Sequence, residues 1–158
     1  MQVRLLGGFA VEVHGRAVED KGWRLRKAKT LVKMLALAEG HRLHREQAIA
    51  VLWPDRAPAA AANNLHQVLH VARRQLNGGD GAPSCLRLDD DVLSLGSETR
   101  LWIDVDAFRH EAVAALRRGD GSRAQAALEL YRGTLLPEDL YADWTEPSRG
   151  ELERLHGE

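Results

Sequence analysis

The chain has a single cysteine, Cys85, and no apolar run long enough to span a membrane. One cysteine excludes an internal disulfide and fits a reducing compartment, and we expect Cys85 to be a small buried residue rather than a reactive thiol. Met1 leads directly into a strand-like segment, so we expect no signal peptide or anchor. These absences predict a cytoplasmic protein.

The motifs of common enzymes and cofactor sites are also lacking. The sequence has no phosphate-binding GxxxxGK[ST] loop, GxSxG elbow, dinucleotide GxGxxG or zinc quartet. His66 and His70 have the spacing of one edge of a metal site, but no cysteine or carboxylate nearby supplies a third ligand. We therefore expect no catalytic residue, no metal and no cofactor, and predict that the chain is not an enzyme.

What the sequence does contain is a strong asymmetry of charge. The 158 residues are 44% apolar and 28% charged, which is typical of a globular protein, and the net charge is only −1. Residues 1–78 hold thirteen Lys and Arg against six Asp and Glu (+7), whereas residues 79–158 hold nine against seventeen (−8). The asymmetry indicates two units with different partners, the first of which faces phosphates or is simply a solvated basic surface.

The first half begins as strands and continues as helix. Apolar runs at 3–6, 9–13 and 17–18, punctuated by glycine, predict a small antiparallel sheet. From Lys27 the apolar residues recur at helical spacing until Gly40 closes the helix. The basic residues of this helix lie off its apolar stripe and either contact phosphates or form a solvated face; they are Arg26, Lys27, Lys29 and Lys33.

Two further helices follow. A connector at 41–43 leads to a short helix over 48–53, which Pro54 ends. The longest helix starts near Ala59 or Ala60 and ends near Asn77-Gly78. Its predicted core stripe consists of Leu65, Val68, Leu69, Ala72 and Leu76.

The opposite face of the long helix carries amides and cations without one acidic residue. At 3.6 residues per turn this face presents Asn63, Gln67, His70 and Arg74, with His66 and Arg73 on one flank. Asn and Gln bond adenine in bidentate fashion, and Arg bonds guanine or phosphate, so the face suits the major groove of DNA. A polar surface helix that is cationic without a DNA partner is the alternative.

A hairpin with an acidic tip follows the glycine-rich turn at 77–81. Residues 85–88 and 92–95 alternate around Asp89, Asp90 and Asp91. Strands, three helices and a hairpin are the order of a winged helix-turn-helix, whose third helix reads the groove. Three carboxylates repel phosphate, so this wing stays off DNA, weakens binding or contacts another protein.

The second half predicts a helix pair. Asp104 is a predicted N-cap before a helix with Val105, Phe108, Ala112, Ala115 and Leu116 on one stripe, and 119–121 break that helix. Ser122 is expected to cap a second helix with Ala124, Ala127, Leu128 and Tyr131, and 146–156 begin a third. A helix pair cannot bury its apolar face alone. Trp102, Leu135, Leu136 and Trp144 would therefore be covered by a missing remainder of a longer regulator, by the winged domain or by a dimer partner. The fold class is mainly α with small antiparallel sheets.

A set of short segments spread over nearly the whole chain carries a family likeness: residues 4–9, 26–29, 44–46, 52–55, 63–65 and 73–76, and downstream 101–108 and 130–137. The most specific cluster is Leu-Trp-Pro-Asp at 52–55, followed by Asn-Asn-Leu at 63–65 and Arg-Arg-Gln-Leu at 73–76. In these residues and their order the chain resembles bacterial transcriptional activators of the antibiotic-regulatory (SARP) type, and the DNA-binding domain of OmpR/PhoB-type regulators. This resemblance implies a winged helix-turn-helix over 1–97 and, over 98–158, the start of a tetratricopeptide-like bacterial transcriptional activator domain.

The resemblance also implies partners. The groove helix would be the segment 63–76, and the loop 54–58, with Asp55 and Arg56 exposed, would face RNA polymerase. Members commonly bind direct repeats of double-stranded DNA as oligomers, so a homodimer is expected.

Two functions from different classes follow. In the first, the chain is a sequence-specific transcriptional regulator of the activator kind, with Asn63, Gln67, His70 and Arg74 reading bases. Its backbone contacts would be Arg26, Lys27, Lys29, Arg45, His66 and Arg73. In the second, the winged fold is a scaffold for protein interaction or oligomerisation, as the acidic wing and acidic helices suggest.

Overall fold

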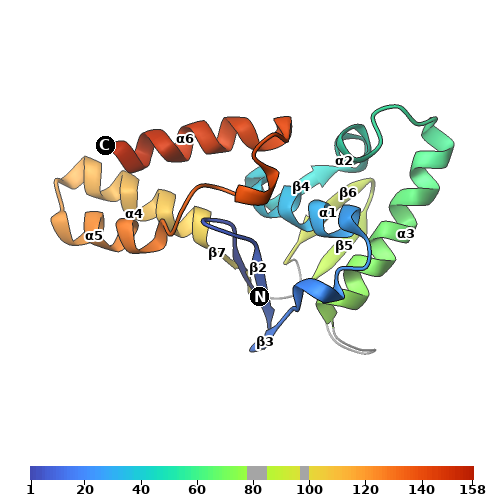
Figure 1. Ribbon diagram of the computed structural model, residues 1–158, viewed down its shortest axis with the longest axis horizontal. Coiled ribbons are helices and arrows are strands. Elements are labelled where there is room, and N and C mark those ends of the chain that lie inside the picture. Colours follow the sequence, from blue (N-terminus) through green and yellow to red (C-terminus); the bar gives the residue numbers. More distant parts are fainter. Residues whose placement is uncertain (78–84, 97–99) are drawn as a thin grey trace. The chain divides into compact units, whose positions relative to one another are not determined.

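The computed structural model describes residues 1–77, 85–96 and 100–158, and most of the expected turn at 77–81 lies outside these residues (Figure 1). Helices dominate, with two small sheet regions, which confirms the predicted fold class. The chain divides into two compact units: Met1 with Glu12–Leu101, and Gln2–Val11 with Trp102–Glu158. Residues 2–11 thus belong to the same unit as the C-terminal helices. The expected boundary at 97/98 instead groups them with the three helices of the first half. No helix in the described part of the chain is long and apolar enough to cross a membrane.

The first unit contains the predicted three helices and the hairpin. Its helices are α1 (Arg26–Leu37), α2 (Arg45–Leu52) and α3 (Pro58–Asn77), with short 3-10 turns η1 (Asp20–Gly22) and η2 (Glu39–His41). Its strands are β2 (Ala10–Val13, which the division splits), β3 (Arg16–Ala17), β4 (Arg42–His44), β5 (Leu86–Asp89) and β6 (Val92–Leu95). Pro58 opens α3, where its fixed φ suits a helix and its missing N–H costs nothing.

The connector expected at 41–43 is in part a strand, because Arg42–His44 form β4 whereas His41 ends the turn η2. Strand β4 pairs antiparallel with β6, and Leu43 lies opposite Leu93. The resulting sheet has the order β4-β6-β5, so the wing hairpin is held to the helices through a third strand. Three residues are too few to show an alternating pattern, and only the pairing with a distant hairpin reveals the strand.

The core of the first unit lies between α1, α3 and this sheet. All five residues of the predicted α3 stripe are buried, together with Ala61. Helix α3 packs against α1 and β5, and α1 packs against β6; Leu31, Val32 and Leu35 of α1 and Leu93 of β6 are fully buried. Each buried leucine contributes about 1.5–3 kcal/mol to stability, so this stripe fixes which face of α3 is turned to solvent.

In the second unit the N-terminal strand pairs with a segment a hundred residues away. Strand β1 (Gln2–Arg4) runs parallel to β7 (Trp102–Ile103), with Val3 opposite Ile103. The expectation that residues 3–6 join a purely antiparallel sheet is therefore wrong, although β2 and β3 do pair antiparallel. The following helices are α4 (Asp104–Arg118), α5 (Gly121–Leu130) and α6 (Glu146–Gly157), with 3-10 turns η3 (Pro137–Asp139) and η4 (Asp143–Thr145).

Asp104 is not the N-cap of α4 that the sequence predicts. The cap residue is Ile103, and the carboxylate of Asp104 instead accepts hydrogen bonds from the N–H groups of Leu5 (2.9 Å) and Leu6 (3.0 Å). Asp104 is only 1% exposed, and burial raises the pKa of its carboxyl although these N–H groups oppose the shift. The side chain thus joins the first turn of α4 to the chain after β1.

The turn between α4 and α5 differs from expectation in its cap. Gly119 ends α4 in the left-handed conformation (φ 63°), which glycine adopts without strain. The N-cap of α5 is Asp120 rather than Ser122, since its carboxylate accepts from the N–H groups of Ser122 and Arg123. The Ser122 hydroxyl, followed by these N–H groups, lowers the pKa of Asp120.

Helix α6 and the segment before it cover one side of the α4–α5 pair. Leu135 and Leu136 are buried within this unit, as is Leu152 of α6, so the expectation that Leu135 and Leu136 need a further surface is wrong. Arg109 of α4 binds Glu151 of α6 at 2.6 Å. The predicted stripes are buried only in part, because Leu116 and Leu128 are each 50% exposed.

Candidate nucleic-acid interface

Helix α3 turns one uninterrupted polar face to solvent. Asn63, Gln67, His70 and Arg74 are all exposed, and so is His66. No residue of α3 is acidic, and the buried stripe on its other side holds the helix in this orientation. The structure therefore brings together all four predicted base-reading side chains on one accessible surface.

Two arginines hold α3 rather than extend this face. Arg73 is half-buried, and its Nε donates to the carbonyl of Leu86 in β5 at 3.0 Å. Arg16 donates to the carbonyl of Leu76 at 3.1 Å, and a cation suits the last turn of a helix. The guanidinium of Arg73 thus lies at the junction of α3 with the wing. The contact of Arg16 with α3 could not be predicted from helical periodicity, because Arg16 lies on a separate strand.

The basic residues of α1 have different surroundings. Lys33 is 3% exposed, so both expectations for it, a phosphate contact and a solvated face, are wrong. The Lys29 ammonium lies 2.6 Å from the Asp20 carboxylate, and this hydrogen bond and charge lower the pKa of Asp20. Lys27 donates to the carbonyl of Leu52 and lies 5.0 Å from the ring centre of Trp53. Arg26, by contrast, is exposed to solvent.

The wing tip is fastened to the start of α2. Asp90 and Asp91 have positive φ values (48° and 65°), as the two central residues of a tight hairpin turn require. The N–H of Arg45 donates to the carbonyl of Asp91 at 2.8 Å, and the two side chains form an ion pair at 3.5 Å. Arg87 pairs with Asp89 at 3.0 Å. Two of the three tip carboxylates therefore have a cation beside them.

The start of α2 is ordered by a capping box. The His44 ring accepts from the N–H of Glu46 at 3.2 Å, and the Gln47 side chain accepts from the N–H of His44 at 2.9 Å. Apolar spacing predicts a helix start three residues later, because the cap residues are polar. The box fixes Arg45, the first residue of α2, next to the wing.

A small hollow lies where α1, the end of α2 and α3 meet. We call it the α1–α3 notch, and its volume is about 330 Å³. Asp55 and Arg56 of the adjoining loop are exposed, and Arg56 lines the notch. The sequence did not reveal the notch, because its residues come from three separate segments; they are Leu25, Arg26, Lys27, Trp53, Arg56, Asn64, Gln67 and Val68.

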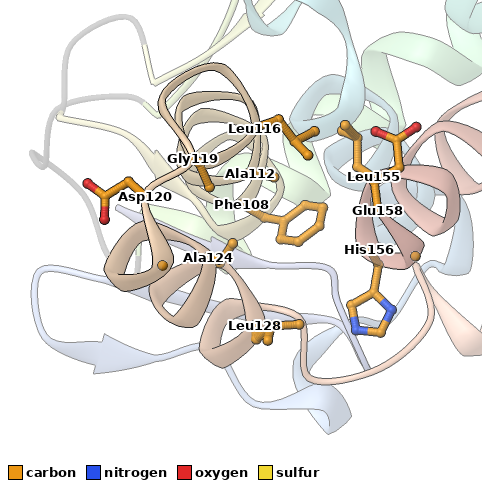
Figure 2. Close-up of a pocket in the computed structure, with 14 residues that line it drawn as sticks. Phe108, Ala112, Leu116, Gly119, Asp120, Ala124, Leu128, Leu155, His156 and Glu158 are labelled. Carbon is orange, nitrogen blue, oxygen red and sulfur yellow. The ribbon is translucent and has the colours of Figure 1, made fainter.

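The second unit has its own cavity, of about 470 Å³ and mainly apolar (Figure 2). Phe108 and the half-exposed Leu116 come from α4, and Leu128 comes from α5. His156 of α6 lies at its edge, where its ring stacks on Tyr131 with 4.1 Å between ring centres.

Among residues 1–77, 85–96 and 100–158, no three His, Cys, Asp or Glu side chains lie together as metal ligands.

A solved structure of EmbR from Mycobacterium tuberculosis, in complex with a low affinity phosphopeptide, matches this fold with a TM-score of 0.78. The match covers 99% of this chain and 42% of that chain, at 21% sequence identity. The chain therefore has the fold of the matched part of EmbR. It spans less than half the length of the EmbR chain, so the likeness concerns a part of that protein. No family model matches the chain, and no curated protein matches it.

Proposed function

We propose that the chain is a sequence-specific DNA-binding transcriptional regulator of the activator kind that acts in the cytoplasm. The single observation that carries the proposal is the exposed, acid-free face of α3, fixed by a buried stripe on the opposite side. Residues 1–97 would be an OmpR/PhoB-type winged helix-turn-helix with α3 in the major groove. Residues 98–158 would be a tetratricopeptide-like bacterial transcriptional activator domain. The resemblance to SARP-type activators and the fold shared with EmbR support this assignment of the two parts.

The side chains of α3 divide into base contacts and backbone contacts. Asn63, Gln67, His70 and Arg74 would face base edges, where amides and guanidinium groups make bidentate bonds. The cations around them would hold phosphates; they are Arg26, Lys27, Lys29, Arg45, His66 and Arg73. Lys29, Arg73 and Arg45 already bind Asp20, Leu86 and Asp91 respectively, so we expect each of them to contribute less than Arg26. Asp55 and Arg56 would face RNA polymerase, and two copies would bind direct repeats.

A second candidate function, protein interaction through the helical unit, is favoured by the apolar cavity of Figure 2. Leu116 and Leu128 line it and are half-exposed, and an apolar groove of this kind is typical of an interaction site. This function does not require the winged unit to bind DNA. The two candidates are therefore separated by a measurement on DNA alone.

The test is selection of bound duplexes from a pool of random DNA sequences, followed by a salt titration on the selected duplex. A regulator is expected to yield an enriched motif. The logarithm of its affinity for the selected duplex should fall steeply and linearly with the logarithm of the salt concentration. Duplexes with the selected sequence scrambled are the control. Weak binding that is the same for every sequence would contradict the proposal and favour the interaction module.

The wing gives a smaller prediction. Substituting Asp91→Asn removes the carboxylate paired with Arg45 and leaves a residue that tolerates positive φ. We expect DNA affinity to rise about two- to fivefold at low salt, since exposed pairs contribute at most about 1 kcal/mol, and the gain to fade at high salt. Titrations with labelled duplex measure it.

The matched control for this prediction is Asp90→Asn. It removes one charge from the same turn, where no ion pair involves Asp90 among the described residues. If both variants gain equally, the wing acts only through its total charge, and release of Arg45 adds nothing.

A further inference from the structure

The α1–α3 notch has the composition of an anion site. Three of its eight residues are cations (Arg26, Lys27 and Arg56), two are amides (Asn64 and Gln67), and none is acidic. A carboxylate would repel a bound anion, and none of the lining residues carries one. Its concave shape brings these donors toward one volume, which a flat basic surface would not do.

One cation of the notch is held in place. The Lys27 ammonium donates to the carbonyl of Leu52, the last residue of α2, and it lies over the ring of Trp53. Trp53 is 7% exposed and supplies an apolar wall that screens charge less than water does. An ammonium has three donors, so Lys27 can bind an anion while these contacts persist.

The other polar side chains of the notch are available to a ligand. Within the described part of the chain, no hydrogen bond or ion pair engages the side chains of Arg26, Arg56, Asn64 or Gln67. Arg26 and Arg56 are also exposed, so neither is neutralised by burial against a carboxylate. The notch thus offers four unengaged polar side chains beside one ammonium that is held in place.

We propose that the notch seats one phosphodiester group of the DNA backbone. The proposal rests on the proposed function and adds a residue-level site to it. Gln67 belongs both to the notch and to the exposed face of α3, so a duplex that contacts this face brings a strand to the notch. Phosphates line both edges of a groove that holds a helix, and guanidinium groups bind them in bidentate fashion.

The site changes two expected roles. Gln67 becomes a phosphate ligand rather than a base reader, and Arg56 becomes a DNA contact rather than a residue that faces polymerase. Asn64, which has no role among the expected base or backbone contacts, becomes a third ligand. Base reading then falls to Asn63, His70 and Arg74.

The experiment combines Arg56→Gln with neutral methylphosphonates placed singly along both strands of the selected duplex. We expect Arg56→Gln to weaken binding about tenfold, as the loss of one charge-assisted bond implies, and to reduce the slope of the salt titration by about 0.9. One methylphosphonate position should weaken the wild-type protein to a similar extent yet leave Arg56→Gln almost unchanged. Arg117→Gln, an exposed arginine of α4 on the other unit, is the control and should change neither quantity.

Each other outcome overturns the site. If every methylphosphonate weakens Arg56→Gln as much as the wild type, no single phosphate occupies the notch, while specific DNA binding stands. If Arg56→Gln binds DNA normally but loses response to RNA polymerase, the loop faces polymerase instead. If inorganic phosphate binds the wild type but not Arg56→Gln, and does not compete with the duplex at constant ionic strength, the notch binds free phosphate rather than DNA. If no duplex binds at all, the proposed function and the site both fail.

Discussion

Substitution of Asp104 by alanine is expected to lower the free energy of unfolding by about 3–5 kcal/mol, which is among the largest effects of any single change in this chain. The carboxylate is almost fully buried and accepts from the N–H groups of Leu5 and Leu6. Alanine would leave both donors buried without a partner and would detach β1 from the start of α4. Urea denaturation monitored by circular dichroism measures the loss. Asp106→Ala, on the exposed side of the same turn, is the matched control and should cost less than about 1 kcal/mol.

The ionisation of Asp104 adds a dependence on pH. Burial raises its pKa in the folded chain above 3.8, so the folded state holds the proton more tightly than the unfolded state. The stabilisation from this proton is complete below pH 3.8 and is lost as pH rises through the folded-state pKa. We therefore expect the stability difference between the wild type and Asp104→Asn, which cannot titrate, to shrink as pH rises over that window. A difference that grows with pH would mean that hydrogen bonding to the charged form outweighs burial.

Asp104 also shows that local sequence patterns do not predict contacts between residues far apart in the chain. An aspartate before an apolar helical stripe is typical of an N-cap, and the sequence therefore predicts this role for Asp104. Its actual partners are Leu5 and Leu6, about a hundred residues earlier, and β1 pairs with β7 across a similar distance in the sequence. Such pairings depend on the folded chain as a whole, whereas helical spacing is a property of about a dozen neighbouring residues.

The long helices were predictable for the same reason. Over α3, five apolar residues recur at a period near 3.6, and each of them is buried. The boundaries of helices were less accurate where a cap rather than spacing decides them, as at His44 and Asp120. The three-residue strand β4 cannot be predicted from local spacing, because it is a strand only through its pairing with β6 of the wing.

The candidate site shows the same division. The exposed face of α3 follows from the sequence, since burial of one stripe leaves the other in solvent. The basic residues of α1 look alike in the sequence, yet Lys33 is buried, Lys29 binds Asp20 and Lys27 borders the notch. Charge alone could not separate them, because their roles depend on Asp20, Leu52 and Trp53, which lie on other segments.

The last prediction concerns Arg74, where the proposed regulator is most directly tested. Arg74→Ala is expected to weaken binding to the selected duplex by about 1–3 kcal/mol, or roughly 5- to 150-fold, because a bidentate contact to a base is lost. Selection repeated with the variant should show a motif that becomes indifferent at one position and keeps the others. Arg118→Ala, an exposed arginine in the last turn of α4, is the control and should leave the motif and affinity unchanged.

The pattern of loss distinguishes a base contact from a backbone contact at Arg74. Asn63 and Arg74 are eleven residues apart, which is about 17 Å along α3, so a duplex that meets the N-terminal part of the helix has its backbone near the other end. If Arg74→Ala weakens all sequences equally and lowers the salt slope by about 0.9, Arg74 binds a phosphate, and the base contacts lie at Asn63 and His70. If affinity and motif are both unchanged, α3 does not lie in the groove by this face. In that case the wing and the helical unit, rather than α3, are where the function of this chain must be sought.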